Sequence, residues 1–160
     1  MNKFSMISVE QAQEDIMDTQ WHELPEVMKM PERATKKSAG YDIFLPYDIK
    51  LEPNEDIKVP TFLNVSLDDG VVLFIAPRSG LGFKYYCRLS NTLGVIDGDY
   101  ISSDNEGHIW VKIRNEGSKT MELKSGQAFC QALFVPFLLQ DGDNFENGAT
   151  RNGGFGSTTK

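Results

Sequence analysis

Short apolar runs separated by turn-forming residues dominate the chain from about Trp21 onward. Four runs are rich in Val, Ile and Phe, which favour β-strands, and they span residues 57–65, 71–76, 109–113 and 129–137. Clusters such as Asp68-Asp69-Gly70 and Ser125-Gly126 stand between them and accept bends or positive φ. Many short strands with regular turns and hardly a helix predict an all-β sandwich, barrel or jelly roll.

The two ends of the chain follow other patterns. Residues 1–20 are acidic and amphipathic, with Ser8 and Gln11 at capping-box spacing, which indicates a short helix or a frayed arm. The glycine-rich tail has one large apolar side chain, Phe155, and we expect it to be flexible when alone. The expected organisation is an extension at 1–20, one β domain at 21–146 and a C-terminal arm at 147–160.

Composition excludes several classes of function. The 16 basic and 23 acidic residues leave a net charge of -7, which disfavours general affinity for a nucleic-acid backbone. Cys87 and Cys130 form no C-x-x-C pair, and with two histidines there are too few soft ligands for a zinc centre. A hard cation bound through oxygen is still compatible with the sequence. The apolar runs are shorter than the roughly 18 residues that a membrane helix needs, and no signal-peptide pattern follows Met1. We therefore expect a cytoplasmic protein without nucleic-acid or membrane partners.

The segment Pro77-Arg78-Ser79-Gly80-Leu81-Gly82 directly follows an apolar run and predicts a turn that binds an anion. Arg78 offers a bidentate donor, Ser79 adds a hydroxyl, and Gly80 lets backbone N–H groups approach an anion closely. An ordinary surface turn is the alternative interpretation of this segment.

A second segment, Gly94-Val95-Ile96-Asp97-Gly98-Asp99-Tyr100, places two carboxylates after an apolar pair. Strand alternation would point Asp97 and Asp99 to one face, unless Gly98 introduces a bulge or a hairpin tip. Since Asp97 follows Val95 and Ile96, which we expect to be buried, it should be rigid and partly desolvated, as a general base requires. An Asp-Gly hairpin turn without catalytic duty is the alternative.

Three other segments carry polar groups that suit a cleft. Ala39-Gly40-Tyr41-Asp42 opens a strand with an acid, and the segment 126–131 begins one with the amide of Gln131; each is also compatible with a plain strand start. In the tail, the segment 153–158 combines glycine N–H groups and hydroxyls with an aromatic ring, which is typical of a lid over a nucleotide. A disordered terminus is the alternative.

Taken in order, these segments resemble the five motifs of the trimeric dUTPase family, from about Met30 to Thr158. The resembling segments are 39–42, 77–82, 91–100, 126–131 and 153–158. The resemblance implies a β jelly roll with a flexible C-terminal arm, and a homotrimer with active sites at its subunit interfaces. It also implies hydrolysis of dUTP to dUMP and pyrophosphate. The Mg2+ ion would be chelated by the triphosphate and water, with no protein ligand.

The resemblance also implies roles for matching residues around the base and sugar. Asp97 would deprotonate the water that attacks the α-phosphate, and Asp42 would be a supporting acid. Tyr100 would lie under the deoxyribose and exclude a 2'-hydroxyl. A hairpin would read the uracil edge with its main chain, through Asn91, Gly94, Val95 and Ile96.

Other matching residues would serve the phosphates and the closing tail. The phosphates would be held by Arg78, Ser79 and Gly80, with help from Gln131. Phe155 would stack on uracil as the tail closes, and the γ-phosphate would meet Gly156, Ser157 and Thr158.

The chain departs from the family pattern in several places. A polar insertion, Ile101-Ser102-Ser103-Asp104-Asn105-Glu106, precedes Gly107-His108, where the family usually has one residue and then Gly-Glu. A solvated loop is the simplest interpretation of this insertion. Arg151 stands four residues before Phe155 where the family commonly has five, so its phosphate role is open. The extension before Trp21 matches no motif.

Two other functions are compatible with the same scaffold. A deaminase acting on dCTP shares the fold and the phosphate-binding parts, although residues 94–100 match the uracil hairpin better. A nucleotide-gated module that binds a regulatory protein partner is the other, and the insertion after Tyr100 would suit such a contact.

Overall fold

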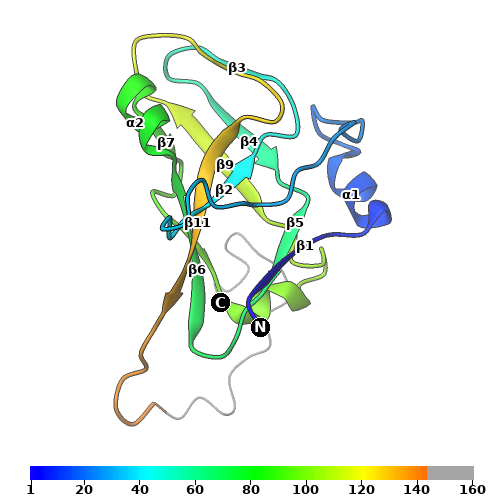
Figure 1. Cartoon of the computed structure of the whole chain (residues 1–160). Helices are drawn as coiled ribbons and strands as arrows, with labels where there is room; N and C mark the ends of the chain where they lie inside the picture. Colours follow the sequence, from blue (N-terminus) through cyan, green and yellow to red (C-terminus); the bar gives the residue numbers. More distant parts are fainter. Residues whose placement is uncertain (144–160) are drawn as a thin grey trace.

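Antiparallel strands form most of the regular structure in the computed structural model, which describes residues 1–143 (Figure 1). The elements in chain order are β1 (Lys3–Met6), α1 (Val9–Ile16), β2 (Tyr41–Phe44), β3 (Ile49–Leu51), β4 (Asp56–Pro60), β5 (Leu63–Ser66), β6 (Val71–Pro77), α2 (Ser79–Tyr85), β7 (Cys87–Leu89), β8 (Gly94–Ile96), the 3-10 helix η1 (Gly98–Ser102), β9 (Trp110–Asn115), β10 (Met121–Leu123) and β11 (Ala128–Pro136). The strands pair as β2-β11-β6-β8, β4-β9-β7, β1-β5 and β10-β3. The all-β prediction is confirmed, and the sheets of the described residues do not close into a barrel.

Alternation of buried and exposed residues explains these short strands. In β3, β7 and β10 an exposed central residue stands between two buried ones. The inward side chains of the sheets join one core, in which Phe62, Ile113 and Phe129 are fully buried. Each large apolar side chain so buried contributes roughly 1.5–3 kcal/mol, and a slip of one residue would expose it. The core therefore sets the strand register.

The run at 57–65, expected as one strand, is two strands in different sheets. β4 pairs with β9, whereas β5 pairs with β1. The break falls at Thr61 and Phe62, where Phe62 adopts a φ of 59°. Its N–H group bonds to the Nε2 atom of His108 instead of a neighbouring strand. Composition alone did not reveal the break, because both halves are equally rich in strand-forming residues.

Residues 3–16 pack into the same core as the rest of the chain. β1 runs antiparallel beside β5 (Figure 1), and α1 buries Ala12 and Ile16. Ser8 is the N-cap of α1 and accepts a hydrogen bond from the N–H of Gln11, so the expected short helix is confirmed. None of the helices in residues 1–143 is long and apolar enough to span a membrane.

Both cysteines are buried free thiols. Burial raises the pKa of the Cys87 thiol to about 11 and the pKa of Cys130 well above its usual value. The two side chains therefore stay protonated near neutral pH and pack as small apolar groups.

Candidate active site

Three of the predicted site residues come together at one end of the four-stranded sheet. Asp42 on β2 pairs with Gln131 on β11, and Gln131 pairs with Ala76 on β6. Paired residues of adjacent strands project to the same face, so Asp42 and Gln131 share a face. Arg78, two residues beyond Ala76, places its Nε atom 3.2 Å from the Oδ1 atom of Asp42. We call Asp42, Arg78 and Gln131 the sheet cluster.

The sheet cluster is partly buried and internally bonded. The Asp42 side chain is 14% exposed and that of Arg78 is 42% exposed. Gln131 donates from Nε2 to the carbonyl of Pro77 at 3.4 Å. A Cβ atom at position 40 would lie 2.7 Å from the Oε1 atom of Gln131, so Gly40 gives the amide its room. The carboxylate holds the guanidinium at this end of the sheet, and the partly exposed Arg78 side chain can still bind an anion.

A helix, not a turn, follows Arg78. α2 begins at Ser79, and the carbonyl of Arg78 accepts from the N–H groups of Leu81 and Gly82, so the expected anion-binding turn was wrong in its geometry. The first N–H groups of a helix have no partner within it, and they still point toward the space before Ser79. Beside them lies a surface depression of about 490 Å3, lined by Pro77, Arg78, Ser79, Gly82, Phe83, Tyr86 and Cys87.

The segment 91–100, which we call the β8 segment, connects two sheets. β7 pairs with β9 and β8 pairs with β6, so β7 and β8 lie in different sheets. Gly94 packs closely on β6, since a Cβ atom there would lie 3.0 Å from the Cβ atom of Ile75. Asn91 is exposed.

Asp97 lies between β8 and η1, at the N-cap position of η1. Gly98 starts the 3-10 helix, so strand alternation stops there and the expected common face for Asp97 and Asp99 does not follow. Asp97 is exposed, and so is Val95 at 50%, whereas Ile96 is buried. The expectation of a partly desolvated Asp97 is therefore wrong for one chain by itself, because only half of the apolar pair before it enters the core.

Tyr100 lies in the core, 4% exposed, and its hydroxyl donates to the carbonyl of His108 at 2.8 Å. The insertion that follows is not a simple solvated loop, because Ser103 within it is buried and so are Gly107 and His108 directly after it. Sequence reasoning missed the contacts of this loop with residues 8–15. The only signals were the capping position of Ser8 and the histidine at position 108.

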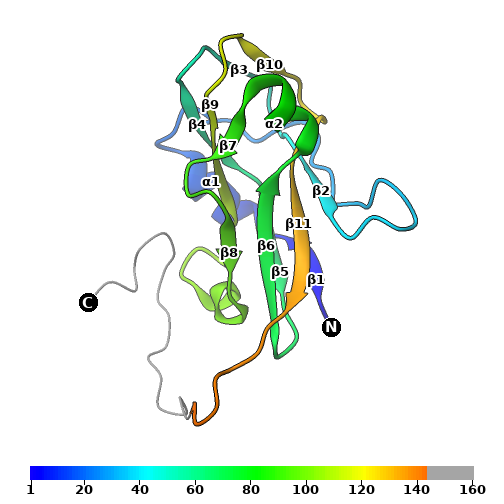
Figure 2. The same ribbon diagram turned by 90° about the vertical axis from the view of Figure 1, so that its left-hand side faces the viewer.

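The sheet cluster and Asp97 lie at opposite ends of β6. Ile96 pairs with Leu73, which places Asp97 opposite the start of β6, whereas Arg78 follows its last residue. About six residues of strand separate the two levels, or roughly 20 Å. Figures 1 and 2 show the same separation, with α2 at one end and the short light-green helix after β8 at the other.

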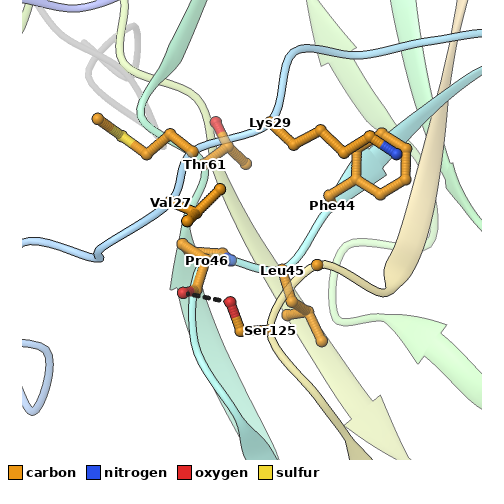
Figure 3. A pocket seen from close by; sticks show the side chains of 9 residues that line it. Val27, Lys29, Phe44, Leu45, Pro46, Thr61 and Ser125 are labelled. Carbon is orange, nitrogen blue, oxygen red and sulfur yellow. Dashed lines mark hydrogen bonds between the residues drawn. The ribbon is translucent and has the colours of Figure 1, made fainter.

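A second cavity contains none of the predicted site residues. This cavity of about 370 Å3 is lined by Val27, Met28, Lys29, Phe44, Leu45, Pro46, Thr61, Ser125 and Gly126 (Figure 3). In it the ammonium of Lys29 lies 3.7 Å from the centre of the Phe44 ring. Among residues 1–143, no three His, Cys, Asp or Glu side chains gather in a way that could hold a metal ion.

The C-terminal predictions lie outside the described residues. These are the arm at 147–160 and the residues Arg151, Phe155, Gly156, Ser157 and Thr158.

Comparison with known proteins gives one consistent result. The family model described as dUTPase matches residues 26–159. A Lactococcus lactis protein named deoxyuridine 5'-triphosphate nucleotidohydrolase is 39% identical over 132 residues, covering 82% of this chain and 88% of its own. The human mitochondrial protein of that name is 35% identical, covering 90% of this chain and 56% of its own. Among solved structures, a dUTPase from Streptococcus mutans is 35% identical with a TM-score of 0.64, covering 75% of this chain and 98% of that one. A dUTPase from phage phi11 of S. aureus, 22% identical, has a similar fold, with a TM-score of 0.65 and coverage of 91% and 96%.

Proposed function

Because this chain belongs to the dUTPase family, we propose that it is a dUTP diphosphatase that hydrolyses dUTP to dUMP and pyrophosphate. The observation that carries the proposal is the sheet cluster. Residues 42, 78 and 131 are far apart in sequence and match three separate family motifs, yet they meet at one end of one sheet. A convergence of this kind is what a binding site for one ligand requires.

The sheet cluster would hold the phosphates. Arg78 supplies a cationic fork, and its ion pair with Asp42 limits the orientations that the guanidinium can adopt before the nucleotide arrives. Ser79 and Gly80, exposed at the start of α2, would add a hydroxyl and backbone N–H groups. Gln131 would assist with its amide.

The β8 segment would handle the base, the sugar and the attacking water. Asp97 would take a proton from water as the water attacks the α-phosphate, a role that typically contributes about 10²- to 10⁴-fold in rate. Main-chain groups at Asn91, Gly94, Val95 and Ile96 would read the uracil edge. Tyr100 would exclude a 2'-hydroxyl by contact with the sugar.

A homotrimer would bring the two groups of residues together. A general base must lie within hydrogen-bond reach of its water, close to the phosphates that Arg78 would hold. Separation by roughly 20 Å along β6 prevents one copy from supplying both groups to one nucleotide. We propose that Asp97 of one copy faces the sheet cluster of a neighbour, where assembly would also remove solvent from Asp97.

The described residues fit a magnesium ion that arrives with the nucleotide. Residues 1–143 offer no cage of three acidic side chains, but a triphosphate supplies oxygen ligands of the kind that Mg2+ prefers. Bound in this way, Mg2+ would offset the negative charge on the triphosphate. Asp42 would meet its hydration shell through water.

From the sequence alone, we propose that the C-terminal arm completes the site. Phe155 would stack on uracil, which is worth roughly 1 to 3 kcal/mol, with Gly156, Ser157 and Thr158 at the γ-phosphate. Deleting the residues from Gly148 onward should raise the KM for dUTP or lower kcat sharply. An unchanged rate would remove the lid from the proposal.

The decisive experiment measures pyrophosphate release from dUTP, dCTP, dTTP and UTP in parallel, with and without Mg2+. We expect release from dUTP to be far faster than from the other three nucleotides, and to depend on the metal. A purified, folded sample that leaves dUTP intact with Mg2+ present would refute the proposal. Ammonia released from dCTP would favour the deaminase instead.

A further inference from the structure

Two features that match none of the five family motifs, the N-terminal residues and the insertion after Tyr100, contact each other. Glu106 accepts hydrogen bonds from the backbone N–H of Ser8 at 2.7 Å and from its hydroxyl at 2.8 Å. These bonds lower the pKa of Glu106, so it is ionised at neutral pH. The insertion thus supplies the carboxylate that a capping box takes from within the helix. On its other side, the carbonyl of Glu106 accepts from the amide of Asn64 at 2.9 Å.

A second contact joins α1 to the end of the insertion. The Nδ1 atom of His108, which is fully buried, lies 2.5 Å from the Oδ2 atom of Asp15. Its Nε2 atom accepts the N–H of Phe62 at 2.9 Å and therefore carries no proton. The ring proton must then be on Nδ1, which donates it to Asp15. Burial lowers the pKa of His108, which agrees with a neutral ring.

The same histidine residue contacts Tyr100 through its backbone. The carbonyl of His108 accepts the Tyr100 hydroxyl at 2.8 Å. Gly107 passes so close to the backbone of η1 that a Cβ atom there would lie 2.6 Å from the Cα atom of Ile101. A continuous path of contacts therefore leads from the carboxylate of Asp15, through the ring and carbonyl of His108, to the hydroxyl of Tyr100.

We propose that Asp15 is a positioning residue for Tyr100, and that its bond to His108 sets how strictly the enzyme rejects a ribonucleotide. The inference rests on the proposed function, in which Tyr100 lies against the sugar. To exclude the 2'-hydroxyl by contact, the Tyr100 ring must be fixed in position, since dUTP and UTP differ by one oxygen atom. The hydroxyl of Tyr100 donates to the carbonyl of His108, and the imidazole ring of the same residue is bonded to Asp15.

The test compares three variants in the full-length protein. Asp15→Ala removes the acceptor, Asp15→Asn keeps an acceptor oxygen, and Glu14→Ala changes the exposed neighbour on the same helix. The ratio of kcat/KM for dUTP to that for UTP is measured with Mg2+. We expect the ratio to fall about tenfold in Asp15→Ala, the scale of a small displacement transmitted to a reacting centre. Asp15→Asn should restore most of the ratio, and Glu14→Ala should match the wild type.

Hydrogen exchange provides a readout that does not depend on activity. In Asp15→Ala, amides of residues 98–108 should exchange faster, whereas those of β6 should keep their wild-type rates. If Asp15→Ala does not fold, Ser8→Ala combined with Asp15→Asn takes its place. Ser8→Ala removes a side-chain bond to Glu106 in the same contact region. The combination should lower the ratio of kcat/KM for dUTP to that for UTP by a smaller factor than is expected for Asp15→Ala.

The outcomes separate this inference from the proposed function. A wild-type protein without activity on dUTP would count against the function. An active wild type whose variants keep the dUTP/UTP ratio would overturn the role of Asp15. Equal losses on both nucleotides would overturn it too, since they would mean that Asp15 serves only the stability of the fold.

Discussion

The sheet cluster and the β8 segment reach their positions by different means. Asp42 and Gln131 sit at paired positions on the adjacent strands β2 and β11, so backbone hydrogen bonds place their side chains directly. Asp97 and Tyr100 lie where a three-residue strand passes into a 3-10 helix, and contacts with distant segments hold them. On paired strands, the backbone hydrogen bonds of the sheet fix the positions of the site residues. A site at a junction depends on what packs behind it.

The sheet cluster and the β8 segment also differ in the chemical groups that they present. The sheet cluster presents a cation held by a carboxylate, which suits the binding of a charged ligand. The β8 segment presents an exposed carboxylate, which suits catalysis once a neighbouring copy covers it, and a buried aromatic ring, which suits selection. Substitutions in the two regions should therefore affect different kinetic constants.

The largest expected effect is on turnover. Asp97→Asn should lower kcat by about 10²- to 10⁴-fold, because the amide cannot accept a proton from water. Affinity for a non-hydrolysable dUTP analogue, measured by calorimetry, should stay near the wild-type value. Asp69→Asn, in an exposed turn before β6, is the matched control. Near-normal turnover of Asp97→Asn would move the general base elsewhere.

A mixed assembly tests whether the two regions act across copies. Arg78→Ala should lose about 10²-fold in activity through weaker phosphate binding. In a trimer that combines this variant with Asp97→Asn, one interface in three would pair an intact Arg78 with an intact Asp97, so about a third of wild-type activity should return. The two chains can be co-expressed with different tags and purified through both. Activity no higher than that of either parent would mean that each site draws on a single copy.

The smallest effect concerns stability, and it involves the contacts behind the β8 segment. Burial, assisted by Lys58 and opposed by Asp15, lowers the pKa of His108 below its unfolded value of about 6.5. The unfolded chain therefore binds more protons below that pH, and His108 contributes stability that is complete above about pH 6.5 and lost as pH falls.

Urea unfolding at fixed protein concentration measures this contribution. Between pH 6.5 and 5.5 the wild type should lose up to roughly 1 kcal/mol more than His108→Gln. The exposed His22 provides a control, and His22→Gln should follow the wild type. Equal pH dependence in all three proteins would exclude His108 as the titrating group.

The sequence predicted the parts of the fold that depend on local pattern. Runs of strand-forming residues with turn residues between them predicted β6, β9 and β11 within one or two residues. It predicted the helix at Ser8 from its capping position. It failed at Phe62, whose N–H group bonds to His108 far away in the chain, and it did not foresee the helix after Arg78.

The candidate site divides in the same way. Its residue types, and their order along the chain, were legible in the sequence. The sequence did not predict the face of the sheet to which Gln131 points, because a register shift in β11 between Ala128 and Cys130 decides it. The sequence did not predict the exposure of Asp97 and Val95 either, since strand alternation does not reveal which strand lies at the edge of a sheet.

By itself the sequence determined the fold class, the strands with strong alternation, and the chemical groups available to a phosphate ligand. Only the tertiary structure decided that Asp42, Arg78 and Gln131 meet, that Asp97 lies at the far end of β6, and that Asp15 is bonded to His108. The physical reason is the distance along the chain over which each interaction acts. Alternation and capping act between residues a few positions apart, whereas a cross-strand pair or a buried carboxylate–imidazole contact joins residues that only the packed core brings together.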